Sequence, residues 1–168
     1  MTLIVEDGSG KSDSESYISV ADASNYHTVR GNTAWAALAS DTVREQCLRK
    51  ATDYIEQVYR SRWQGCRVGE TQALSWPRYD VEVEGYAIDS DVVPDAVKRA
   101  CAELALKVSS AELLADQSQG VLSEQVGPIA VTYDKSSPQR VRYPAIDAVL
   151  SPYLLANGGG CSMGVIRS

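Results

Sequence analysis

The residues best suited to binding chemistry lie between positions 59 and 79, where arginine side chains alternate with aromatic rings. Aromatic and guanidinium groups offer a large contact area and are common at protein interfaces. The same combination suits single-stranded DNA, because bases stack on rings while guanidinium groups neutralise phosphates. We predict that this stretch contacts a partner, another protein in our main interpretation, through seven residues: Arg60, Arg62, Trp63, Arg67, Leu74, Trp76 and Arg78.

The same stretch also has a purely structural interpretation. Leu74 and Trp76 would then fold the segment back onto neighbouring helices, and Pro77 would set a turn. Two glycines and a proline prevent residues 59–79 from forming one regular element. We therefore expect a long structured connection in which apolar residues anchor the loop and arginines face the partner, with Glu70 and Asp80 reducing its positive charge.

Catalytic and metal-binding patterns are weak along the chain. His27 is the single histidine, and we expect it on a helix at the surface or half-buried rather than as a general base. The four cysteines are widely spaced without a Cys-x-x-Cys pair, which disfavours zinc, and Cys47 and Cys101 are expected to be buried. We predict no enzyme activity, no catalytic residue, no cofactor and no metal.

Two short patterns allow a chemical interpretation that we do not favour. Residues 10–12, Gly-Lys-Ser, match the end of a phosphate-binding loop, but Val5 stands where the motif needs its first glycine. We interpret residues 6–16 as a solvated loop. The acids of residues 80–84 alternate with valines, which places them on the water-facing side of a strand rather than in a metal site.

Length and charge limit the classes of protein that fit. A chain of 168 residues is long enough for one domain with a substantial core. The net charge of −6 disfavours a general nucleic-acid binder, which needs a positive surface. No apolar run is long enough to cross a membrane, and no basic start precedes an apolar leader segment, so we expect no membrane partner and a reducing, cytoplasm-like compartment.

Apolar spacing and capping residues predict a mainly α fold, a small bundle of about four helices. The helices are expected at residues 19–30, 41–60, 91–114 and 143–154, with Ser19 and Ser40 or Asp41 as caps. The third is apolar over much of its circumference and should be central. Residues 35–38 should form an apolar turn that covers the core, and Pro152 should kink the last helix.

The C-terminal third predicts a β-hairpin, with strands at residues 121–126 and 129–133 around Gly127-Pro128. A lone hairpin is marginally stable, so it should pack on the helices or pair with another chain. We divide the chain into a helical domain, 1–156, and a flexible tail, 157–168. Met163, Val165 and Ile166 in that tail either add a strand to a partner's sheet or belong to a frayed terminus.

Several motifs together suggest a family. They are residues 31–38, Ala51 to Tyr54, residues 59–65, the run Gln-Ala-Leu-Ser-Trp-Pro-Arg at 72–78, Pro94 to Ala105, Val-Gly-Pro-Ile at 126–129, and Tyr143 to Ala145. In this set the chain resembles tailed-phage head-tail connector (adaptor) proteins over nearly its whole length. Some related sequences are labelled as similar to a primosomal single-stranded-DNA-binding protein.

The resemblance implies a helical bundle with a small hairpin that assembles with itself into a ring of about a dozen subunits. The ring would sit in the virion between the portal protein and a tail-proximal connector or tail terminator, after synthesis in the host cytoplasm. Double-stranded DNA would pass through it without specific binding, and an acidic lining would repel the phosphates. The alternative is a single-stranded-DNA-binding protein that assists replication.

Overall fold

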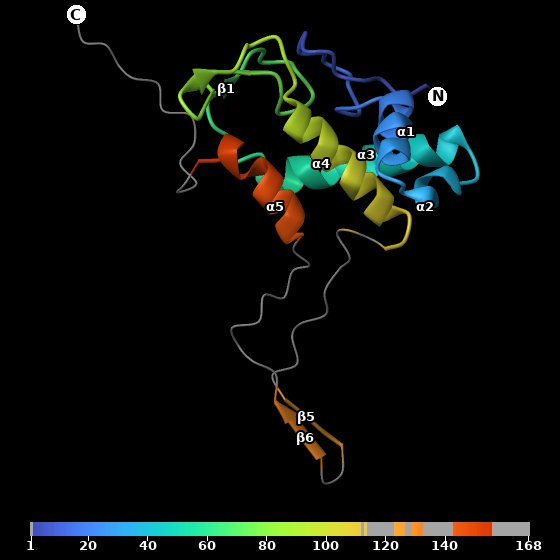
Figure 1. The fold of residues 1–168 in the computed structure, drawn as a ribbon. Coiled ribbons are helices and arrows are strands. Elements are labelled where there is room, and N and C mark those ends of the chain that lie inside the picture. Colours follow the sequence, from blue (N-terminus) through green and yellow to red (C-terminus); the bar gives the residue numbers. More distant parts are fainter. Residues whose placement is uncertain (1, 112, 114–122, 127–128, 133–142, 156–168) are drawn as a thin grey trace, which may run out of the picture.

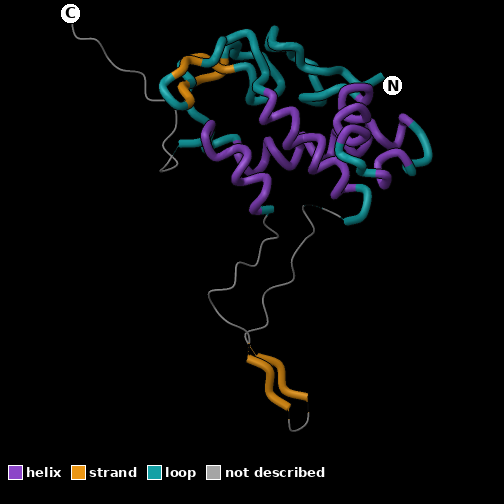
Figure 2. Tube along the Cα trace, viewed as in Figure 1, coloured by secondary structure: helices purple, strands orange, loops and turns teal. Residues whose placement is uncertain are grey.

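The computed structural model describes residues 2–111, 113, 123–126, 129–132 and 143–155. In these residues five α-helices and one 3-10 turn are accompanied by three two-stranded antiparallel pairs (Figures 1 and 2). The predicted fold class is confirmed: a small, mainly helical bundle with a β-hairpin and a long connection between two of its helices. That connection joins α3 to α4.

The first two helices form a corner of the bundle. Helix α1 (Val20–Val29) begins at the predicted cap, because Ser19 Oγ accepts a hydrogen bond from the backbone N–H of Asp22 at 3.0 Å. Helix α2 (Thr33–Ala36) replaces the predicted apolar turn with a single helical turn. It buries Trp35, whose indole N–H donates to Ser24 Oγ at 3.0 Å and thereby ties α2 to α1.

Helices α3 (Asp41–Tyr59) and α4 (Asp95–Val108) cross at the centre of the molecule (Figure 1). Ser40 caps α3 as predicted, through its Oγ and the N–H of Val43. The predicted limits of α4 were wrong at both ends. Pro94 is the N-cap with extended backbone, so the four residues before α4 stay outside the helix, and the helix ends at Val108 rather than near residue 114.

The predicted central position of the third long helix is confirmed. Helix α4 contacts α1, α3 and α5 (Pro144–Leu150). Its buried side chains point to more than one neighbour, and they are Val97, Ala100, Cys101, Ala102, Leu104 and Ala105. After α5 the chain continues as a 3-10 turn (η1, Ser151–Tyr153), so the bend expected at Pro152 is a change of helix type.

The connection contains two short strand pairs rather than the single strand predicted for residues 80–86. Strand β1 (Cys66–Arg67) pairs with β2 (Arg78–Tyr79), and β3 (Glu82–Val83) pairs with β4 (Tyr86–Ala87). Glu84 and Gly85 have φ values of 54° and 86°, as a tight hairpin turn requires. The acid–valine alternation was therefore interrupted by a turn that its glycine signals.

The predicted C-terminal hairpin is confirmed as strands β5 (Ser123–Val126) and β6 (Ile129–Thr132), paired from Ser123–Thr132 to Val126–Ile129. It stands apart from the helices in Figure 1. Its turn, residues 127–128, and the predicted tail, 157–168, lie outside the described residues. Cys47 and Cys101 are buried as expected, and both are free thiols, whereas Cys66 is disulfide-bonded.

Candidate nucleic-acid interface

The structure buries four of the seven connection residues predicted to contact a partner, among them both tryptophans. Trp63 is 1% exposed, Trp76 is 0% exposed, and Leu74 and Arg78 are also buried. The indole rings of Trp63 and Trp76 meet edge to face at 5.6 Å, and Trp76 meets Tyr153 in the same way at 5.9 Å. These rings fill the core beneath the connection, so no base or partner side chain reaches their faces.

Arg78 holds the connection together from inside. Its guanidinium donates to the backbone oxygens of Gln64 (2.6 Å), Gly65 (2.6 Å) and Ser75 (3.1 Å). A planar group with several N–H donors suits three converging carbonyls, which a buried loop must satisfy. The Arg67 guanidinium also donates a hydrogen bond to a backbone oxygen of the connection, that of Gln72, at 2.9 Å. Both arginines therefore stabilise the connection through hydrogen bonds within it.

A polar network fastens the connection to the rest of the chain. The hydroxyl of buried Tyr17 donates to the Glu56 carboxylate on α3, and Ser75 donates to Glu56 through its N–H (3.1 Å) and its Oγ (2.7 Å). Burial raises the pKa of Tyr17, with the neighbouring Glu56 charge adding to the effect. Tyr17 therefore stays protonated and serves as a donor across the physiological pH range.

Of the predicted interface residues in the connection, only Arg60 and Arg62 are exposed at the surface. The Arg62 guanidinium lies 5.6 Å from the ring centre of buried Tyr59. Tyr79, near the other end of the connection, is an exposed aromatic residue, and Asp80 beside it is exposed too. The remaining predicted contacts, Met163, Val165 and Ile166, lie outside the described residues, so the tail stays a prediction.

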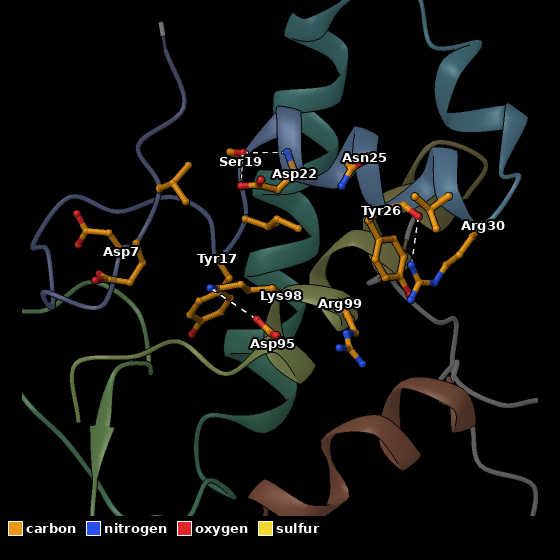
Figure 3. Close-up of a pocket in the computed structure, with 14 residues that line it drawn as sticks. Asp7, Tyr17, Ser19, Asp22, Asn25, Tyr26, Arg30, Asp95, Lys98 and Arg99 are labelled. Atoms are coloured by element: carbon orange, nitrogen blue, oxygen red, sulfur yellow. Dashed lines mark hydrogen bonds and ion pairs between the residues drawn. The ribbon is translucent and has the colours of Figure 1, made fainter. Parts of the chain in front are cut away.

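A second candidate surface is a pocket of about 690 Å³ between the N-terminal loop, α1 and the start of α4 (Figure 3). Sequence analysis missed it. Tyr26, Arg30 and Arg99 gather at one end of this pocket, and Asp7 lies toward the other. The only sequence signal was the spacing of Tyr26 and Arg30, which places the two side chains on one helix face.

The acidic residues that line the pocket are engaged within the chain. Asp7 forms an ion pair with Lys11 at 2.8 Å, and this contact lowers the pKa of Asp7. Asp22 accepts a hydrogen bond from Ser19 Oγ at 2.7 Å, and Asp95 lies 3.9 Å from the Lys98 ammonium. Each carboxylate thus has a local donor or cation close to it.

Two arginines of the pocket have no carboxylate partner among the described residues. The Arg30 guanidinium lies 3.6 Å above the Tyr26 ring and donates to the Tyr26 backbone oxygen at 3.3 Å. The Tyr26 hydroxyl in turn donates to Glu103 at 2.9 Å, which holds the ring in place. Arg99 is exposed, one residue after Lys98 on α4. Positive charge and a flat stacked surface therefore meet at this end.

The Gly-Lys-Ser loop beside the pocket has no room for a phosphate, because the side chain of Glu6 occupies it. The buried Glu6 carboxylate accepts from the backbone N–H groups of Gly8 (3.0 Å), Gly10 (2.8 Å) and Lys11 (2.9 Å), and from Ser14 Oγ at 3.0 Å. These amides are the donors that a phosphate would use. Residues 6–16 form a loop as predicted, but the loop is not fully solvated, because Glu6, Ser14 and Ser16 are buried.

His27 is buried, so the prediction of a surface or half-buried residue was wrong. Its Nε2–H donates to the Ala102 oxygen at 3.1 Å, and Nδ1 accepts from the Asn32 amide at 3.0 Å. The ring also stacks on Trp35 at 4.9 Å. Burial lowers the pKa of His27, so the neutral ring is a packing element between α1, α2 and α4.

Across the described part of the chain, no cluster of three or more His, Cys, Asp or Glu side chains is arranged to hold a metal ion. None of the described helices is long and apolar enough to cross a membrane. The surface candidates are therefore the exposed arginines of the connection and the pocket beside α1.

The family model described as "Putative DnaT-like ssDNA binding protein" matches residues 1–168, the whole chain. No curated protein and no solved structure matches the chain. The match agrees with the label noted for some related sequences, and it gives no support to the head-tail connector assignment.

Proposed function

The chain belongs to the family described as "Putative DnaT-like ssDNA binding protein", and from this membership we propose that it binds single-stranded DNA as an accessory to replication. The observation that carries the proposal is the family match over the full length of the chain. The family match therefore favours single-stranded-DNA binding, the alternative in our sequence analysis, over a head-tail connector.

The physical chemistry of the surface supports a modest, local contact. The net charge of −6 works against broad attraction to phosphates, so binding must depend on a few exposed cations rather than on the whole surface. Burial of Trp63 and Trp76 removes the stacking platform that the connection was expected to offer. Exposed arginines such as Arg30 and Arg99 remain available for phosphate.

Fluorescence anisotropy with a labelled oligo(dT) of about 12 nucleotides tests the proposal, since single-strand binding sites span about 4 to 16 nucleotides. We expect binding at about 50 mM salt that weakens steadily as salt rises, and weaker binding to a duplex of equal length. Absence of oligo(dT) binding at low salt would overturn the proposal.

A head-tail adaptor remains the second candidate, on the basis of the connector-like residue pattern and the acidic chain. An acidic protein suits a conduit that repels DNA, and this candidate implies self-assembly into a ring, contact with the portal and a tail protein, and a place in the virion. Arg60 and Arg62 would be the exposed connection residues available for such contacts.

Quantitative mass spectrometry of purified virions separates the two candidates. Copy numbers equal to those of the portal protein would favour the adaptor, whereas absence from virions would exclude it. Size-exclusion chromatography with light scattering adds a second criterion, because a stable ring is many times the mass of the 18.2 kDa chain.

A further inference from the structure

We propose that the pocket between the N-terminal loop, α1 and α4 holds one nucleotide unit of a single strand. The phosphate would lie at Arg30 and Arg99, and the base would lie on the Arg30–Tyr26 stack. This inference rests on the proposed function and adds the site, which no comparison assigns.

Charge distribution is the first argument. Among the pocket's charged residues, the aspartates have local partners in Lys11, Ser19 and Lys98, whereas Arg30 and Arg99 have no carboxylate partner in the described residues. The end of the pocket formed by Arg30 and Arg99 is therefore locally positive, although the chain as a whole is acidic. Two guanidinium groups on different helices suit a phosphodiester, because each offers several N–H donors in a plane.

Pre-organisation is the second argument. Arg30 is held against the Tyr26 ring at 3.6 Å and by its bond to the Tyr26 oxygen, while Glu103 holds the Tyr26 hydroxyl. One guanidinium face is thus covered and its plane is set. Bases of single strands stack on such guanidinium planes as well as on aromatic rings, and a pre-set plane lowers the entropy cost of binding.

The opposite end of the pocket limits the contact. Asp7 and Asp22 keep their negative charge there, and both are exposed. A second phosphate at that end would be repelled, so the pocket takes one unit and the strand leaves on the Arg30 side. A short contact of this kind fits a protein whose overall charge is negative.

The test compares two pairs of substitutions that each remove two exposed arginines. The first is Arg30→Ala with Arg99→Ala, in the pocket; the second is Arg60→Ala with Arg62→Ala, in the connection. We expect the pocket pair to weaken oligo(dT) binding by about tenfold or more at low salt. The slope of log K against log salt should also decrease in magnitude by about 0.7, the contribution of the one phosphate contact that the two arginines share.

A third variant guards against misfolding. Arg99 makes no hydrogen bond or ion pair with the described residues, so Arg99→Glu reverses a pocket charge without removing an internal contact, and its thermal melting should match the wild type. Arg99→Glu should weaken binding at least as much as Arg99→Ala alone.

Each result has one meaning. Strong loss in the pocket pair and in Arg99→Glu, with little loss in the connection pair, supports the site. Wild-type binding with equal loss in both pairs, or with no loss in Arg99→Glu, overturns the site and leaves single-strand binding intact. Failure of the wild type to bind oligo(dT) overturns the proposed function, and the site with it.

Discussion

Glu6 shows how one side chain can organise a loop that resembles a ligand site. Its carboxylate is 2% exposed and accepts four hydrogen bonds, three of them from backbone N–H groups. Hydrogen bonds to a charged group are stronger than neutral ones, and buried donors left without a partner are costly.

We expect Glu6→Gln to lower the free energy of unfolding by about 2 to 3 kcal/mol. The glutamine NH₂ group would face backbone N–H groups, so some of these donors would lose their acceptor. Urea denaturation measures this change. Asp13→Asn, in the same loop but exposed, is the matched control and should change stability by less than about 0.5 kcal/mol. Equal effects of the two substitutions would show that the Glu6 contacts do not stabilise the fold.

His27 predicts a pH dependence, because burial lowers its pKa from the ordinary value of 6.5. Below that value the unfolded chain binds a proton that the folded chain resists. Stability is therefore fully present above about pH 6.5 and falls as the pH drops toward the lower, folded pKa. His27 is the single histidine of the chain, so no other imidazole contributes to this change.

Urea denaturation at several pH values from roughly 7.5 to 5.5 tests this expectation. His27→Gln, whose side chain does not titrate, should be less stable at every pH, and its unfolding free energy should change less across the same pH range. A wild type whose stability is constant or rises on acidification would contradict the burial of a neutral ring.

At the scale of elements, the connection behaves as a structured unit because Arg78 bonds three carbonyls within it. Arg78→Lys keeps the charge but loses the planar fork, so we expect a loss of about 2 kcal/mol in unfolding free energy. Arg62→Lys is the exposed control and should stay within about 0.5 kcal/mol. Chemical denaturation of both variants gives the comparison.

Close backbone approach at Gly65 makes a second test of the connection. Gly65 has a φ of +60°, and an added Cβ would lie 2.0 Å from the Tyr79 oxygen. Gly31 has a similar φ of +70° with nothing within 4 Å. We expect Gly31→Ala to cost about 1 kcal/mol from conformation alone and Gly65→Ala to cost at least about 2 kcal/mol more, as measured by thermal unfolding. Equal costs would show that the backbone at Tyr79 moves away from the added Cβ without loss of stability.

At the scale of the whole molecule, the tryptophans stabilise the fold and are poor probes of function. Trp76 is fully buried between Trp63 and Tyr153, so Trp76→Ala should destabilise the chain by about 3 to 5 kcal/mol. Lost DNA binding or lost assembly would then report unfolding. Near-ultraviolet circular dichroism together with denaturation checks this, and a Trp76→Ala variant that melts like the wild type would contradict the burial.

Local signals predicted much of the helical framework. The caps Ser19 and Ser40, the apolar spacing of α3 and the Gly-Pro turn of the hairpin each act within a few residues, so they can be recognised in a sequence. The start of α4 was placed too early because Pro94 is compatible with the first turn and with the cap, and only the extended backbone distinguishes them.

The sequence by itself determined a mainly helical, acidic chain with an arginine-rich connection and no catalytic pattern, because composition and periodicity carry that information. Only the tertiary structure decided which groups are available to a partner. It buried Trp63, Trp76 and Arg78, filled the glycine loop with Glu6, and brought Arg30 at the end of α1 and Arg99 of α4 to the same pocket. Burial and proximity depend on residues far apart in the chain, and a local pattern does not record which neighbours the fold will supply.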